Sequence, residues 1–219
     1  MSRLIVFDCD GTLVDSQQLI VEAARQTLIA HALEPREAAA VRAVIGLSLD
    51  LALAQLVPDA DERMLISLVA TYRATWRLLR AQGVLEPLFP RAREVLGALD
   101  RSGHLLGVAT GKSRAGLIEV LDHHGLTALF VSLQTADRHP SKPHPSMLEE
   151  AMRETGSAPA ETLMVGDTSF DMAMARAAGA RAIGVGWGYH PPELLEAAGA
   201  ERVLHDFDQL LECIGGAVR

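Results

Sequence analysis

The chain has 219 residues, of which 49% are hydrophobic and 22% are charged, and its formal net charge at pH 7 is −8. This length can bury a sizeable core in one or two domains, and the composition is that of an ordinary globular protein. The negative balance argues against a surface built for nucleic acid or anionic lipid, and no apolar run approaches the ~18–20 residues that span a bilayer. We therefore expect a cytoplasmic protein with neither nucleic-acid nor membrane partners.

The first predicted strand, residues 3–8, leads directly into Asp8-Cys9-Asp10-Gly11-Thr12. Side chains two positions apart on a strand point the same way, so the two carboxylates would repel each other unless a positive group lay between them. A calcium loop starting at Asp8 would need Gly at its sixth position and Glu at its twelfth. Those positions hold Leu13 and Leu19, which excludes that loop. An ordinary turn remains an alternative for this segment alone, because Asp and Gly favour turns.

The N-terminal segment carries aspartates where a leader would carry basic and then apolar residues, so we expect no signal peptide. The two cysteines, Cys9 and Cys213, lie at opposite ends of the chain without any metal-binding spacing. We therefore expect two free, buried thiols, with neither a disulfide framework nor a structural zinc site.

Residues 16–83 carry helical patterns and no strand pattern. We predict three or four successive helices from the segments 16–33, 35–46, 48–57 and 61–82. Residues 83–90 contain one glycine and two prolines, which indicate a linker. The sequence therefore predicts an all-helical domain, 16–83, inserted after the first strand of a domain made from 1–15 and 84–219.

After the linker, helical and strand patterns alternate. The predicted strands are 104–110, 129–135, 162–167 and 181–186, and the predicted helices are 90–103, 113–125, 145–156 and 169–179. Each helix is followed by a glycine where a helix C-terminus favours one. Short, almost continuously apolar strands are typical of a parallel sheet covered on both faces. The expected fold class is α/β, with a doubly wound, Rossmann-like parallel sheet.

Ligands of such sheets bind beyond the carboxyl ends of the strands, and polar residues gather at these positions. They occur in the segments Thr110-Gly111-Lys112, Ser141-Lys142-Pro143 and Gly166-Asp167-Thr168-Ser169-Phe170-Asp171. Each segment alone could be a turn or a helix start. Together with Asp8 and Asp10 they place several carboxylates at one sheet edge, which favours a divalent cation among them. Oxygen-only ligands favour Mg²⁺, which characteristically works with phosphate.

The four segments DCDGT, ATGK, KPHP and GDTSFD occur in this order and resemble the motifs of the haloacid dehalogenase-like phosphohydrolases. The resemblance covers essentially the whole chain and is strongest to phosphoglycolate phosphatase-like members with an inserted helical cap. It implies that Asp8 attacks phosphorus and forms an aspartyl-phosphate, and that Asp10 protonates the leaving group and later activates water. Members that remove halogen generally lack the second aspartate, so Asp10 favours phosphoryl chemistry.

The same resemblance implies the ligands of the site. Mg²⁺ would be held by Asp8, the backbone carbonyl of Asp10 and Asp167, with Asp171 supporting it from behind. Thr110, Gly111 and Lys142 would bind the phosphoryl oxygens. Cap residues would choose the substrate, and the candidates in the turn between two cap helices are Arg42, Gly46, Leu47 and Ser48. An interpretation without substrate contact is equally good: Arg42 would be a solvated helix residue, and Gly46 would end the helix.

The expected function is Mg²⁺-dependent hydrolysis of a small phosphorylated metabolite, with 2-phosphoglycolate as a candidate. Two enzymatic alternatives stay open, a phosphosugar mutase and an inorganic pyrophosphatase, because the cap decides between them. A non-catalytic phosphate-binding regulator is a third alternative, although no catalytic group of the motifs has been lost. The sequence makes no prediction of the oligomeric state.

Overall fold

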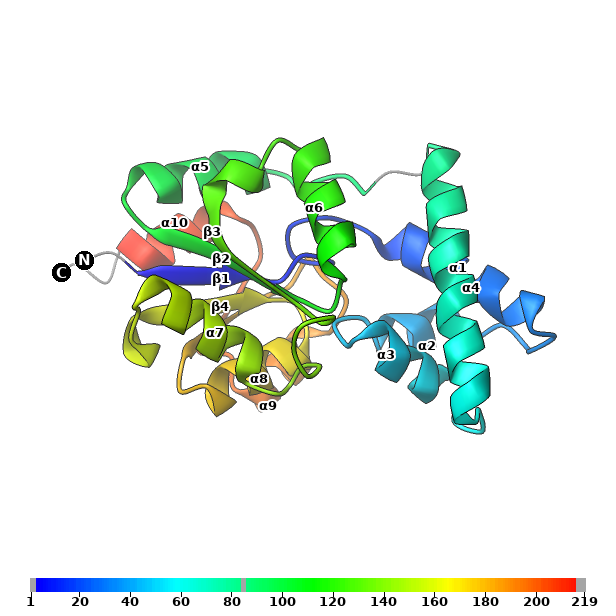
Figure 1. The fold of residues 1–219 in the computed structure, drawn as a ribbon. Coiled ribbons are helices and arrows are strands. Elements are labelled where there is room, and N and C mark those ends of the chain that lie inside the picture. The colour runs from blue at the N-terminus through cyan, green and yellow to red at the C-terminus, as the bar shows by residue number, and fades with distance from the viewer. Residues whose placement is uncertain (1–2, 84–85, 216–219) are drawn as a thin grey trace.

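The computed structural model describes residues 3–83 and 86–215 (Figure 1). Its centre is a six-stranded sheet in the order β3-β2-β1-β4-β5-β6, in which every neighbouring pair is parallel. The strands are β1 (Leu4–Phe7), β2 (Leu105–Thr110), β3 (Phe130–Thr135), β4 (Thr162–Gly166), β5 (Arg181–Val185) and β6 (Arg202–Leu204). Phe7 pairs with Val108 on one side and Val165 on the other, so β1, β2 and β4 end at one edge.

Helices cover both faces of this sheet (Figure 1). One face carries α5 (Ala92–Arg101), α6 (Arg114–His123) and α10 (Asp208–Gly215), and the other carries α7 (Ser146–Thr155), α8 (Ser169–Ala177) and α9 (Pro192–Ala198). Alternate residues of β1 serve the two faces: Ile5 and Phe7 pack in the first cluster, Leu4 and Val6 in the second. The predicted doubly wound α/β fold is confirmed, and the apolar strands are explained by burial on both sides.

The C-terminal part contains elements that the sequence patterns did not predict. These are α9, β6 and α10. β6 has only three residues, and of these only Leu204 is buried. Two short 3₁₀ helices, Thr127–Leu129 and Pro159–Glu161, lead into β3 and β4. Cys9 is a buried free thiol, whereas Cys213 is only partly buried.

Between β1 and α5 the chain forms α1 (Gln17–Ala30), α2 (Ala38–Arg42), α3 (Leu49–Leu56) and α4 (Glu62–Ala81). These helices lie together beyond the end of the sheet toward which β1 runs (Figure 1). They have a hydrophobic cluster of their own, which includes Leu28, Leu53 and Leu68. α2 is shorter than the predicted segment 35–46, because residues 43–46 form turns and Gly46 has a φ of +101°.

Residues 84 and 85, where the sequence suggested a domain boundary, lie outside the described part of the chain. Within that part, no helix combines the length and the apolar character needed to cross a membrane.

Candidate active site

Three buried carboxylates meet at the edge where β1 and β4 end. Asp8 directly follows β1, Asp167 directly follows β4, and Asp171 lies in the first turn of α8. One ligand oxygen from each lies within 4.8 Å of the others. We call Asp8, Asp167 and Asp171, together with Lys142, the acidic cluster. Gly11 makes this approach possible: its φ is +80°, and a Cβ there would collide with the Asp167 carboxylate.

The oxygens of Asp167 and Asp171 are fixed by protein donors. Asp167 Oδ1 accepts a 2.9 Å hydrogen bond from Thr12 Oγ1, and its Oδ2 accepts one of 2.9 Å from the backbone N–H of Tyr189. Asp171 Oδ2 accepts from the hydroxyl of Thr168 at 2.7 Å and from the backbone N–H of Thr168 at 3.1 Å, the second bond being part of the capping box that begins α8. These two side chains are therefore held in single orientations.

Lys142 supplies the positive charge of the acidic cluster. Its Nζ lies 2.6 Å from Asp171 Oδ1 and 3.0 Å from Asp8 Oδ1, and its side chain is fully buried. Burial by itself lowers the pKa of Lys142, but the charges of Asp171 and Asp8 outweigh this effect and raise it above its ordinary value. The lysine is therefore an ammonium at neutral pH.

Asp8 has one oxygen in use and one free. Its Oδ1 accepts from the backbone N–H of Cys9 at 2.6 Å and from Lys142, whereas its buried Oδ2 has no hydrogen-bond partner among the described residues. Burial raises the pKa of Asp8 to about 7, although the charge of Lys142 acts in the opposite direction. Burial and the two neighbouring carboxylates also raise the pKa of Asp167. Three carboxylates against one ammonium leave an excess of negative charge, which suits a bound cation.

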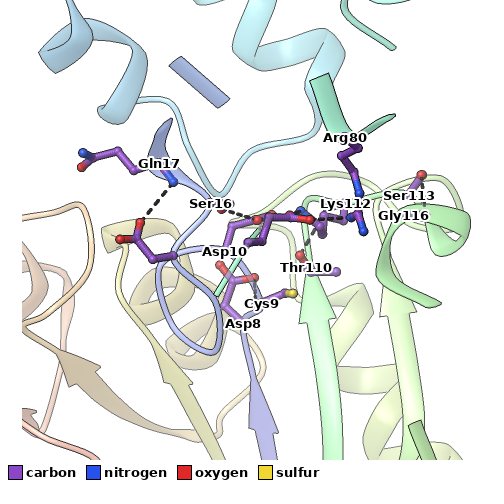
Figure 2. A network of polar contacts seen from close by, with 12 residues as sticks. Asp8, Cys9, Asp10, Ser16, Gln17, Arg80, Thr110, Lys112, Ser113 and Gly116 are labelled. Atoms are coloured by element: carbon purple, nitrogen blue, oxygen red, sulfur yellow. Dashed lines mark hydrogen bonds and ion pairs between the residues drawn. The ribbon is translucent and has the colours of Figure 1, made fainter. Parts of the chain in front are cut away.

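Asp10 belongs to a second set of charges, shown in Figure 2. Its Oδ1 accepts a 2.5 Å hydrogen bond from Ser16 Oγ and lies 2.7 Å from Lys112 Nζ. Lys112 also contacts Glu86 Oε1 at 2.7 Å, and Glu86 Oε2 contacts Arg80 Nη1 of α4 at 2.6 Å. We call Asp10, Lys112, Glu86 and Arg80 the bridging cluster, because it joins the part of the chain that contains the sheet (residues 3–15 and 86–215, called the sheet domain) to the inserted helices.

A cavity of about 650 Å³ separates the sheet edge from the inserted helices. On the sheet side its lining includes Asp8 and Asp10 after β1, Thr110 at the end of β2, and Gly111 and Lys112 directly after β2. The inserted helices contribute mostly apolar side chains, including Val44, Leu53, Tyr72 and Trp76, with Arg73 and Arg77 at exposed positions. Lys142, Asp167 and Asp171 do not line it. Asp8 is therefore the member of the acidic cluster that faces the cavity.

The turn between α2 and α3 touches the sheet domain directly. The backbone N–H of Ser48 donates to Ser141 Oγ at 2.8 Å, and a Cβ at position 111 would collide with the carbonyl oxygen of Leu47. Gly46, Leu47 and Ser48 line the cavity, as a role in substrate choice requires. Arg42 is half-buried at the end of α2 and is not among the lining residues.

The sequence reasoning missed several residues of this site, among them Lys112, Glu86 and Tyr189. Lys112 lies inside the quoted ATGK segment but received no role, although its place just after a strand end was a usable signal. Glu86 sat in a segment interpreted only as a linker. Tyr189, from a loop given no role, supports Asp167 through its N–H and contacts Ser16 Oγ through its hydroxyl at 3.2 Å. No local pattern could have indicated these two partners.

Comparisons with known proteins show the family and the fold of the chain. The model of the family described as haloacid dehalogenase-like hydrolase matches residues 5–185. The chain is 39% identical over 218 residues to a protein of Dickeya dadantii named Probable phosphatase IndB, covering 96% of this chain and 93% of that protein. It is 30% identical to a phosphoglycolate phosphatase of Vibrio parahaemolyticus, covering 97% and 96%. A hydrolase from Pseudomonas syringae has the same fold, with a TM-score of 0.88, 28% identity and 99% coverage of both chains.

Proposed function

Because the chain belongs to the haloacid dehalogenase-like hydrolases, and its similar proteins are named phosphatases, we propose that it is a Mg²⁺-dependent phosphatase. Its substrate would be a small phosphate monoester, hydrolysed through an aspartyl-phosphate on Asp8. The observation that carries this proposal is Asp8 Oδ2, a buried oxygen without a protein partner on a residue that lines the cavity. An unpartnered buried carboxylate oxygen is costly unless a ligand or a reaction uses it.

The proposed reaction has two displacements at phosphorus. Asp8 Oδ2 attacks the phosphoryl group, the bond from phosphorus to the ester oxygen breaks, and Asp10 gives its proton to the departing oxygen. Asp10, now a carboxylate, takes a proton from water, and the resulting hydroxide attacks the phosphorus of the aspartyl-phosphate. The bond to Asp8 then breaks and inorganic phosphate leaves. Thr110, Gly111 and Lys142 bind the phosphoryl oxygens in this proposal.

Mg²⁺ fits the acidic cluster, because the donor set is all oxygen and carries excess negative charge. In this proposal Asp8, the backbone carbonyl of Asp10 and Asp167 hold the ion, and Asp171 supports the site while it binds Lys142. When bound, the ion neutralises charge on the phosphoryl oxygens and on the nucleophile.

We also propose that residues 16–83 act as a cap over the domain formed by 1–15 and 84–219. The apolar side chains above the sheet edge would exclude water from the reaction, and Gly46, Leu47 and Ser48 would contact the substrate beside Asp8. Arg42 remains a candidate for substrate choice through its place next to this turn. The candidate substrate 2-phosphoglycolate is supported by the phosphoglycolate phosphatases among the similar proteins.

The experiment is phosphate release from a panel of monoesters that includes 2-phosphoglycolate, measured with Mg²⁺ for the wild type and for Asp8→Asn. Asp100→Asn, on the exposed face of α5, is the matched control. We expect release by the wild type and the control and none by Asp8→Asn. Equal rates for the wild type and Asp8→Asn would contradict the proposal. Interconversion of sugar phosphates with little free phosphate would identify a mutase, and release from pyrophosphate alone a pyrophosphatase.

A further inference from the structure

We infer that Lys112 is a positioning residue for Asp10, and that Glu86 and Arg80 hold Lys112 in place from the linker and the cap. This inference rests on the proposed function, because it gives Asp10 its role as proton donor to the leaving group. The four-motif assignment gives Lys112 no role in the reaction. The contacts that carry the inference are those of the bridging cluster.

Both contacts of the Asp10 carboxylate fall on the same oxygen. Ser16 Oγ donates to Oδ1 at 2.5 Å, and Lys112 Nζ donates to Oδ1 at 2.7 Å. No described residue donates a hydrogen bond to Asp10 Oδ2, and Asp10 lines the cavity. One oxygen is therefore anchored by two donors, which leaves the other to exchange a proton with the leaving group. A proton donor must be held within hydrogen-bond reach of the oxygen that it serves.

The surroundings of Lys112 explain why it keeps this position. Its Nζ lies midway along a row of alternating charges, and the exposed fractions of the side chains are 11% for Asp10, 10% for Lys112, 1% for Glu86 and 12% for Arg80. The ammonium also lies 4.7 Å from the centre of the Trp76 ring, a favourable cation–π contact. Within the bridging cluster each buried charge is paired with an opposite one, and Arg80 also contacts the largely exposed carboxylate of Glu119 at 3.4 Å.

The far end of the bridging cluster belongs to the inserted helices. Arg80 and Trp76 both lie on α4, whereas Lys112 follows β2. Glu86 is held on the sheet side as well, because its backbone carbonyl is 2.8 Å from the His124 ring Nε2. A change in the position of α4 would therefore take Trp76 away from Lys112 and Arg80 away from Glu86, and would loosen the support of the lysine that anchors Asp10.

The test compares two phosphate esters whose leaving groups differ in their need for a proton. An alkyl ester found active in the panel releases a strongly basic alkoxide, whereas p-nitrophenyl phosphate releases a weakly basic nitrophenolate. We expect Lys112→Met to lower kcat/KM for the alkyl ester by about a hundredfold, near the lower end of what a positioned proton donor contributes. For p-nitrophenyl phosphate we expect a loss of about threefold or less, because its leaving group departs without protonation.

Three further variants complete the design. Arg91→Met removes an exposed cation that pairs with Asp208 far from the cavity, and it should leave both values unchanged. Glu86→Gln keeps the side-chain shape and should show the same ester-selective loss with a smaller amplitude. Lys112→Arg keeps the positive charge and should recover part of the alkyl-ester activity. If Lys112→Met fails to fold, Glu86→Gln and Lys112→Arg still carry the ester comparison.

The outcomes distinguish a failure of the positioning role of Lys112 from a failure of the phosphatase proposal. Equal losses on both esters, or no loss on either, would overturn the positioning role of Lys112 while leaving the phosphatase proposal intact. Failure of the wild type to release phosphate from any ester would overturn the phosphatase proposal itself. A selective loss on the alkyl ester in both Lys112→Met and Glu86→Gln would support the positioning role.

Discussion

The two charged clusters beside the cavity differ in composition and in origin. The acidic cluster has three carboxylates and one ammonium, and all four residues belong to the sheet domain. The bridging cluster has two carboxylates and two cations, and it extends into α4 of the inserted helices. The first carries an excess of carboxylates, whereas in the second each buried charge is paired and one partner, Arg80, lies on α4. Metal binding and cap position can therefore be perturbed separately.

The largest effect is expected from Lys142→Met, which removes the one ammonium of the acidic cluster. Loss of one partner from a buried ion pair costs about 3–5 kcal/mol, because a charge is left unpaired. The pKa of Asp8 would rise further, since Lys142 is the group that lowers it. We expect phosphatase activity to fall by about a thousandfold or more and the melting temperature to fall by several degrees.

Arg153→Met is the matched control for Lys142→Met, because it breaks an exposed ion pair with Glu150. Exposed pairs contribute about 0–1 kcal/mol, so this control should keep both activity and melting temperature. Activity of Lys142→Met within tenfold of the wild type would show that the ammonium is dispensable to the acidic cluster.

The second prediction concerns Mg²⁺ itself. Asp167→Asn removes one negative charge from the acidic cluster but keeps the shape that Thr12 and Tyr189 hold. We expect isothermal titration calorimetry to show Mg²⁺ affinity lowered by about tenfold to a hundredfold, whereas Asp100→Asn should bind as the wild type does. Lys112→Met should also keep its affinity, since Lys112 pairs with the side chains of Asp10 and Glu86 and with no carboxylate of the acidic cluster. Unchanged Mg²⁺ affinity in Asp167→Asn would place the ion elsewhere.

The sequence predicted the acidic cluster better than the bridging cluster, and the reason is physical. Asp8 and Asp167 directly follow apolar strands, so the parallel sheet alone brings them to one edge. Asp10 and Lys112 are 102 positions apart, and their contact with Glu86 depends on how a linker folds back. The sheet's strand patterns carry no information on that path. Similarly, the three-residue β6 is too short to show a period, so the C-terminal elements stayed unpredicted.

The third prediction uses the pKa of Asp8, which burial raises to about 7 in the metal-free protein. Folded Asp8 binds its proton more tightly than unfolded Asp8, so this group reduces stability as pH rises from about 4 through 7. Mg²⁺ binds the carboxylate form, so its stabilising effect should grow over the same range. We expect Mg²⁺ to raise the melting temperature by several degrees more at pH 8 than at pH 5.5.

Asp8→Asn is the comparison that isolates this titration, because its amide carries no proton equilibrium in this range. In that variant, the pH dependence of the Mg²⁺ effect should shrink. An equal Mg²⁺ effect at both pH values in the wild type would show that Asp8 is already ionised in the metal-free protein.

The smallest effect is expected at the contact between Gly111 and the turn that joins α2 to α3. Gly111→Ala would place a methyl group against the carbonyl oxygen of Leu47, so the turn has to shift away from the cavity. We expect KM to rise by about tenfold while Mg²⁺ affinity stays unchanged, because the acidic cluster has no member from the cap. Steady-state kinetics and calorimetry on the same preparation measure both quantities.

Gly97→Ala is the control, since Gly97 lies within α5 and its added methyl would meet only the flexible end of Arg101. Its KM should equal that of the wild type, and the helix should gain a few tenths of a kcal/mol or more from alanine. If Gly111→Ala weakened Mg²⁺ binding as much as it raised KM, the cap and the acidic cluster would be coupled. Mg²⁺ binding and the position of the inserted helices could then no longer be perturbed separately, because a displacement at Gly111 would also change the affinity of the acidic cluster for Mg²⁺.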